Sequence, residues 1–148
     1  MATIIGNGSA NTLPGTTGGD DIYGRNGADT ILADAGNDSL YGENGADSLL
    51  GEAGNDSMVG TNGPDVLIGG PGRDTLIGLG GDDEMTGDDG NDVIDGGNGS
   101  DELTGGAGID YMDGQAGIDT LIGGLAATIC WAARAPIPSA TLRSPRAH

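Results

Sequence analysis

The chain has 148 residues, 32 of them glycine and none phenylalanine, and it carries 23 acidic against 5 basic residues. A chain of this length forms at most one domain, and its formal charge of −18 excludes nucleic acid as a partner, because phosphate groups need a basic surface. No apolar run is long enough to span a membrane, and the single cysteine, Cys130, has no partner in the chain for a disulfide.

Residues 1–5 are a short apolar lead-in, and residues 6–122 are thirteen copies of one nine-residue unit. The first unit, GNGSANTLP, is degenerate, with Ser9 and Asn11 in the glycine and aspartate positions, as is usual for a terminal repeat that caps a stack. From Gly15 onward the units are regular, except that Ala33 replaces the first glycine of its unit.

Three positions of the unit are held in phase along the repeats. The sixth position holds Asp20, Asp29, Asp38, Asp47, Asp56, Asp65, Asp74, Asp83, Asp92, Asp101, Asp110 and Asp119. The fourth position holds Gly18, Gly27, Gly36, Gly45, Gly54, Gly63, Gly72, Gly81, Gly90, Gly99, Gly108 and Gly117. The eighth position holds an aliphatic residue or methionine in every unit, from Leu13 to Leu121. Composition bias cannot produce three columns in register.

Each unit divides into a turn and a strand. The six residues G-x-x-G-x-D form the turn, because glycine permits positive φ and close backbone approach. The last three residues form a minimal strand whose central side chain faces inward. Two units would make one coil of 18 residues, with coils stacked about 4.8 Å apart. The pattern therefore predicts an all-β fold, a right-handed parallel β-roll (β-solenoid) with two repeats per coil, followed by an irregular C-terminal tail.

The unit resembles the nonapeptide G-G-x-G-x-D-x-U-x of the RTX (repeats-in-toxin, haemolysin-type calcium-binding) family. The resemblance implies that Ca²⁺ ions lie between neighbouring coils, bound by the aspartates and by main-chain carbonyls of the glycine-rich turns. It also implies a secreted, extracellular bacterial protein, typical of type I secretion, that folds on calcium binding and belongs to or derives from a larger toxin, enzyme or adhesin.

Charge supports the calcium interpretation independently. All 23 acids lie in the repeats, opposed there only by Arg25 and Arg73, so that the repeat region carries −21. Aspartates 18 residues apart would stack on one side of the roll, leaving five gaps on each side and ten calcium sites, with a weaker one between Asn11 and Asp29. Ten ions would nearly cancel the charge, whereas unscreened carboxylates about 5 Å apart repel each other by about 3 kcal/mol per pair at an effective dielectric near 20.

Two further segments are outside this pattern. The ninth positions from Tyr23 to Ile77 are apolar, which is explained either by β-propensity or by a face for a protein partner or for self-association. Residues 123–148 are an atypical tail without aspartate. We predict that residues 125–148 are repeat sequence in a shifted reading frame and are poorly ordered. A shift of one base can turn the codons of Thr128 and Ile137 into aspartate codons, and these positions lie 9 and 18 residues beyond Asp119, in register with the repeats. A genuine alanine-rich cap around Ile129–Trp131 is the alternative.

Other functions are less consistent with the sequence. The only histidine is His148, and the paired carboxylates belong to a repeating column rather than one cleft, so we expect no enzyme. No EF-hand loop recurs. The alternatives that stay open are an acidic solenoid without specific ions and a calcium-stabilised structural, adhesion or ice-binding solenoid. The last of these needs regular outward Thr or Asn ladders.

Overall fold

A computed structural model describes residues 1–124 and 128–131, and within these ranges all regular structure is β-strand. One sheet has eight strands: β1 (Thr3–Ile5), β3 (Asp21–Asn26), β5 (Ser39–Asn44), β7 (Ser57–Asn62), β9 (Thr75–Gly80), β11 (Val93–Asn98), β13 (Tyr111–Asp113) and β15 (Ile129–Trp131). The other has seven: β2 (Thr12–Pro14), β4 (Thr30–Leu32), β6 (Ser48–Leu50), β8 (Val66–Ile68), β10 (Glu84–Asp89), β12 (Glu102–Ala107) and β14 (Thr120–Ile122).

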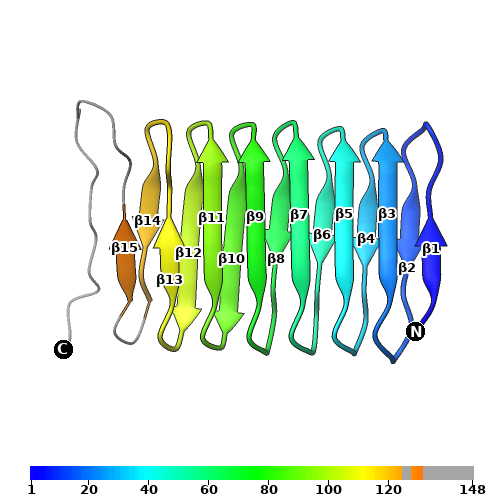
Figure 1. Cartoon of the computed structure of the whole chain (residues 1–148), viewed down its shortest axis with the longest axis horizontal. Helices are drawn as coiled ribbons and strands as arrows, with labels where there is room; N and C mark the ends of the chain where they lie inside the picture. The colour runs from blue at the N-terminus through cyan, green and yellow to red at the C-terminus, as the bar shows by residue number, and fades with distance from the viewer. Residues whose placement is uncertain (125–127, 132–148) are drawn as a thin grey trace.

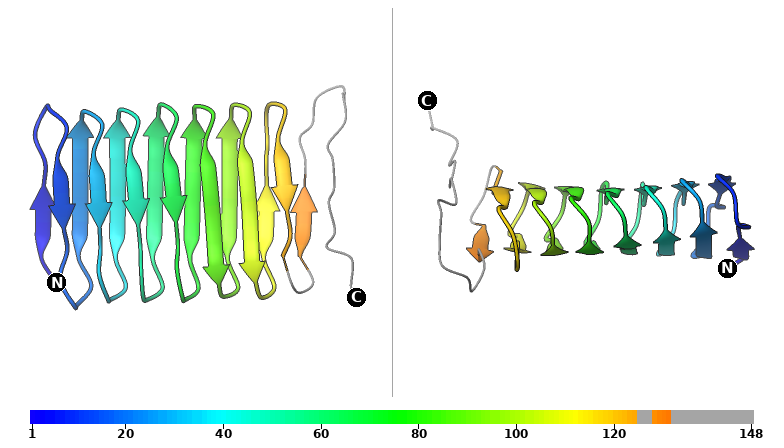
Figure 2. Two further views of the ribbon diagram at one scale, coloured as in Figure 1. Left: turned by 180° about the vertical axis from the view of Figure 1, so that it is seen from behind. Right: turned by 90° about the horizontal axis from the view of Figure 1, so that it is seen from above.

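Successive strands alternate between the two sheets, and every pairing is parallel with a register of 18 residues, as in Ile22↔Leu40. The chain therefore winds as a right-handed β-solenoid of about seven turns, with β1 at one end and β15 at the other (Figure 1). Seen from above, the sheets form two facing layers joined by short turns (Figure 2). The predicted β-roll is confirmed. In the described ranges no helix is present that could cross a membrane.

The core lies between the sheets and is one side chain thick on each side. Each eighth-position residue points inward, because strand residues alternate between the two faces of a sheet. The core residues are Leu13, Ile22, Ile31, Leu40, Leu49, Met58, Leu67, Leu76, Met85, Ile94, Leu103, Met112 and Leu121, joined by Ala33. This ladder of aliphatic side chains holds the sheets together, and its position fixes the turns at the two edges of the roll.

The strands differ in length from the predicted three residues. Several of them, such as β3 and β10, run six residues and continue into the first half of the following turn. In these longer strands the second residue of the turn takes a left-handed φ, as at Arg25 (φ 81) and Asp88 (φ 72), and still pairs with the coil beside it.

The repeat register extends beyond the last regular unit. Strand β15 pairs with β13 through Tyr111↔Ile129, Met112↔Cys130 and Asp113↔Trp131, so Cys130 takes the eighth position of a further, degenerate unit. This strand coincides with the cap considered above. The rest of the predicted tail, including Ile137, lies outside the described residues.

Candidate metal centre

The turns bring the twelve predicted aspartates into two stacks, one at each edge of the roll, and bury all of them. The Asp20 column precedes the strands of the eight-stranded sheet and consists of Asp20, Asp38, Asp56, Asp74, Asp92 and Asp110. The Asp29 column precedes the strands of the seven-stranded sheet and consists of Asp29, Asp47, Asp65, Asp83, Asp101 and Asp119.

One oxygen of each carboxylate links neighbouring coils. Oδ1 of Asp65 accepts a hydrogen bond from the backbone N–H of Asp47 at 2.8 Å, and the N–H of Asp65 donates to Oδ1 of Asp83 at 2.8 Å. The same bond recurs down both columns, for example from Asp74 to Asp92 at 2.8 Å. Each aspartate is therefore a structural connection between two coils, whatever else it binds.

The second oxygen has no protein partner in most units. Among the described residues, ten buried Oδ2 atoms lack a hydrogen bond, those of Asp29, Asp38, Asp47, Asp56, Asp65, Asp74, Asp83, Asp92, Asp101 and Asp110. A buried, unpaired charged oxygen costs several kcal/mol, so folded proteins almost always satisfy it. Ten of them in one repeated position indicate that a further, positively charged group completes the site.

Nine of these ten oxygens point at the first-position glycine of their own turn, and the tenth, that of Asp38, belongs to the turn in which Ala33 replaces this glycine. We call the space where a Cβ on that glycine would lie the cradle. In the cradle of Gly24, Oδ2 of Asp29 and the carbonyl oxygen of Gly42 in the next coil both lie 2.7 Å from the Cβ point. At Gly51, Oδ2 of Asp56 lies at 2.5 Å and the carbonyl oxygen of Gly69 at 2.7 Å. A carboxylate and a carbonyl from adjacent coils thus converge where the glycine has no side chain.

These ligands suit calcium. Ca²⁺ binds six to eight hard oxygen ligands and tolerates irregular geometry. The described residues contain no group of three or more His, Cys, Asp or Glu side chains placed to hold a metal ion, so carboxylates alone cannot fill a coordination shell. Main-chain carbonyls have to supply the rest, and the glycine-rich turns expose them. The donors therefore fit a calcium ion held between coils.

The fourth-position glycines, which we predicted as backbone ligands, have another visible role. Gly45 (φ 153) and Gly54 (φ 157) take a conformation that L-residues avoid, and a Cβ on either would overlap the carbonyl of the fourth glycine in the preceding coil. Their carbonyls remain predicted ligands. The sequence analysis missed the first-position glycines as site residues, although their column is equally regular from Gly42 to Gly114.

Burial and stacking disfavour ionisation of the metal-free carboxylates. Burial, opposed by the backbone hydrogen bond and supported by repulsion from the stacked aspartates, raises the pKa of Asp56 to about 7. Burial likewise raises the pKa of Asp65 and of Asp74 to about 6. A bound divalent cation would counter both causes, because it offsets the desolvation of the carboxylates and screens their mutual repulsion.

The ends of the columns depart from the pattern. Oδ2 of Asp20 accepts hydrogen bonds from the backbone N–H and the hydroxyl of Thr16, at 2.8 and 2.7 Å. In the first unit, Oδ1 of Asn11 takes the place of Oδ2 beside Gly6. In the degenerate unit that contains β15, Thr128 takes the aspartate position, and its hydroxyl donates a hydrogen bond to the Gly123 carbonyl at 2.7 Å.

A parallel solenoid with stacked carboxylates and glycine cradles at both edges defines a calcium-binding repeat protein. The sequence profile of the RTX calcium-binding nonapeptide repeat (4 copies) matches residues 5–40, 14–49, 23–58, 59–94 and 95–127. The chain belongs to this family, and its repeats are a structural calcium-binding module. No curated protein matches the chain in a whole-sequence comparison.

Proposed function

We propose that the chain folds when it meets calcium outside the bacterium that makes it, and that it acts as a calcium-dependent folding module of a larger exported toxin, enzyme or adhesin. The observation that carries this proposal is the set of ten buried Oδ2 atoms without a protein partner. A folded, metal-free roll would have to bury ten such oxygens unpaired, and calcium removes that cost.

The same atoms support a proposed number of ions. Ten unpaired oxygens, five in each column, support about ten calcium ions bound between coils. The predicted ligands are the carboxylates of both columns together with turn carbonyls of the fourth and first glycines. The chain itself is not an enzyme in this scheme, because the carboxylates are spread along two edges rather than gathered in one cleft.

Secretion gives calcium its role as a switch. In cytosol, where calcium is scarce, the repulsion within each column keeps the chain unfolded and able to be exported. Extracellular calcium-binding modules work at about 10⁻⁴–10⁻³ M, which is the range in which we expect the roll to close. Folding after export would also draw the chain outward, because the folded state forms only on the calcium-rich side.

Far-ultraviolet circular dichroism during a calcium titration tests the proposal. We expect a disordered spectrum in excess chelator and a cooperative gain of strand signal as calcium is added. A full strand signal that persists in chelator would refute it and would favour the acidic solenoid without specific ions.

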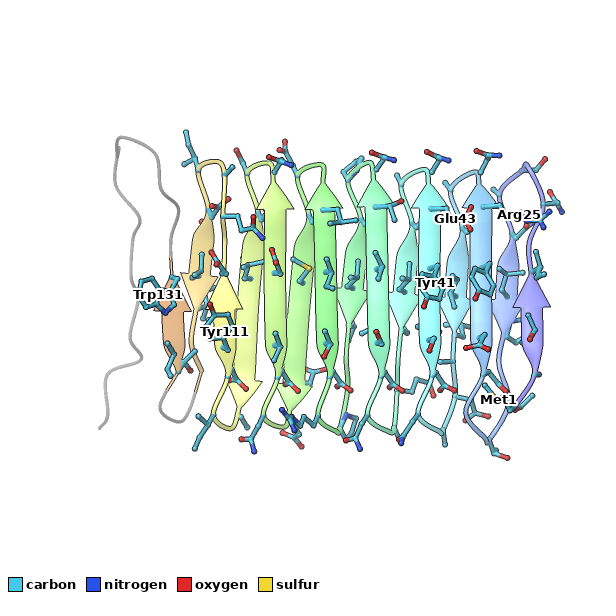
Figure 3. All side chains as sticks on the ribbon, in the orientation of Figure 1. Met1, Arg25, Tyr41, Glu43, Tyr111 and Trp131 are labelled. Carbon is cyan, nitrogen blue, oxygen red and sulfur yellow. The ribbon has the colours of Figure 1, made fainter. Side chains whose placement is uncertain are left out.

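The outward apolar stripe from Tyr23 to Ile77 supports a second, separate role in association. Tyr23 and Tyr41 stack with ring centroids 4.9 Å apart on the eight-stranded sheet, followed by the partly exposed Val59 and Ile77. Figure 3 labels Tyr41 on strand β5. In the same sheet, the ninth positions beyond Ile77 change to aspartate at Asp95. Sedimentation of the calcium-loaded chain at rising concentration would detect self-association. Tyr41→Thr, which removes an aromatic ring from this stripe, should weaken that self-association.

A further inference from the structure

Ala33 occupies a position that is glycine in every other unit. Its turn is otherwise ordinary. The backbone N–H of Ala33 donates to Leu50 at 2.9 Å, as that of Gly51 does to Ile68 at 2.9 Å. Asp34 and Gly36 take the usual left-handed φ of 71 and 153. Ala33 is fully buried, so its methyl group does not reach solvent. The unit therefore differs from its neighbours by one methyl group in the cradle.

That methyl group stands where the ion ligands converge in the other units. In the next unit of the same column, a methyl group on Gly51 would lie 2.5 Å from Oδ2 of Asp56 and 2.7 Å from the Gly69 carbonyl. A methyl carbon and an oxygen atom overlap sterically at these distances, so the carboxylate has to shift. An apolar methyl group also supplies no ligand. Oδ2 of Asp38, in the Ala33 turn, is one of the buried oxygens without a partner.

The preceding turn of the same column has its carboxylate held by the protein. Thr16 donates two hydrogen bonds to Oδ2 of Asp20, at 2.8 and 2.7 Å, so this oxygen already has protein partners. No oxygen of Asp20 is among the nearest atoms to the cradle of Gly15, which faces the backbone of Ala33 instead. Two consecutive turns at the N-terminal end of one column thus depart from the ion-binding arrangement.

We propose that Ala33 closes the cradle beside Asp38, so that the Asp20 column binds its first full calcium ion at the Gly51 turn, while the Asp29 column begins at Gly24. The inference rests on the proposed calcium function and corrects its count: the Asp38 position contributes no ion, although its oxygen is unpaired. The N-terminal coils on that edge are held by backbone ladders and by Thr16, without an ion.

Native mass spectrometry of the calcium-loaded chain counts bound ions one at a time and tests this. We expect Ala33→Gly to bind one ion more than the wild type, because it restores the cradle. Gly51→Ala should bind one ion fewer, because it fills a cradle. Gly80→Ala is the matched control, since a Cβ there meets nothing nearer than the Thr61 carbonyl at 3.7 Å, and its count should equal that of the wild type.

The outcomes separate this inference from the proposed function. A wild-type chain that binds no calcium would refute both. A wild-type chain that binds calcium, with Ala33→Gly giving the same count while Gly51→Ala loses one ion, would overturn the role of Ala33 alone. Ala33→Gly places the residue of all other units in this position, so it should fold; Gly69→Ala provides a second filled cradle if Gly51→Ala does not.

Discussion

From Arg25 onward, the second residue of each turn has a left-handed backbone, yet it is often not glycine. Thr61 (φ 96), Leu79 (φ 73) and Gln115 (φ 54) occupy this position, whereas Gly70 (φ 97) and Gly97 (φ 94) occupy it in other units. An L-residue in this conformation costs roughly 1–2 kcal/mol. The roll tolerates the cost because the side chain at this position points away from the core, so that only the backbone is strained.

Leu79→Gly should therefore stabilise the calcium-loaded chain by about 1 kcal/mol, since relief of the backbone strain exceeds the extra entropy of glycine in the unfolded chain. Leu79 is about half exposed, so little buried surface is lost. Thermal unfolding in saturating calcium measures the change. The control is Ile118→Gly, an exposed residue without positive φ, which should destabilise. A lower midpoint for Leu79→Gly would contradict the assignment of strain.

The raised carboxylate pKa values predict an unusual pH dependence. The pKa is about 7 at Asp56 and about 6 at Asp101 in the folded chain, against 3.8 for the ordinary group. A raised folded-state pKa means that the folded chain binds more protons than the unfolded chain, so metal-free stability rises as pH falls from about 7 toward 4. Calcium binding should weaken over the same interval, because protons compete for the carboxylates.

We expect the strand signal in chelator to increase when the pH is lowered from about 7.5 to 5.5, and the calcium concentration at half-folding to rise. Circular dichroism at each pH measures both. Loss of strand signal on acidification in chelator would show that carboxylate repulsion does not keep the metal-free chain open.

At the level of the elements, the sequence predicted the coil and its contents but not the details of the cradle. The 18-residue coil, the inward ladder from Leu13 to Leu121 and the two aspartate columns follow from periodicity alone, and the structure places them accordingly. The first and fourth glycines are equally regular in sequence, so only the fold shows that the carboxylate Oδ2 faces the first. The sequence indicated Ile129–Trp131 only as an alternative cap and not as a further strand of the sheet, because this unit has lost both the aspartate and the fourth-position glycine.

Position in the stack should determine the effect of losing an aspartate. Asp65→Ala removes the acceptor of the Asp47 N–H and the ligand beside Gly60 in the middle of the roll, and it should uncouple the coils on either side. Asp20→Ala removes a carboxylate already held by Thr16 at the end of the stack and should cost less. Asp89→Ala, an exposed acid, controls for charge alone.

The calcium midpoint and the cooperativity of folding measure these effects. We expect the largest rise in midpoint and a broadened transition for Asp65→Ala, a smaller rise for Asp20→Ala and little change for Asp89→Ala. Equal shifts for Asp65→Ala and Asp20→Ala would contradict a stack in which each coil depends on its neighbours.

Across the whole molecule, the negative charge opposes compaction of the chain, and the fold offers few apolar contacts to counter it. The formal charge of −18 favours an expanded chain, and the core has only one layer of apolar side chains from each of the two sheets. Among residues 1–124 and 128–131, each strand pairs only with strands of the coils beside it, so no distant strand pairing stabilises this part of the roll. Neutralisation of the columns must therefore reach all coils for the chain to become compact.

Small-angle X-ray scattering should show this transition as a change of size. In chelator we expect a radius of gyration near 40 Å, the value for an unfolded chain of this length, and in millimolar calcium a value below about 25 Å. Magnesium at the same concentration should not compact the chain fully, because Mg²⁺ demands near-octahedral geometry and gives up its water reluctantly, whereas the cradle ligands come from two coils with fixed spacing. Equal compaction by both ions would indicate that charge screening, and not coordination between coils, closes the roll.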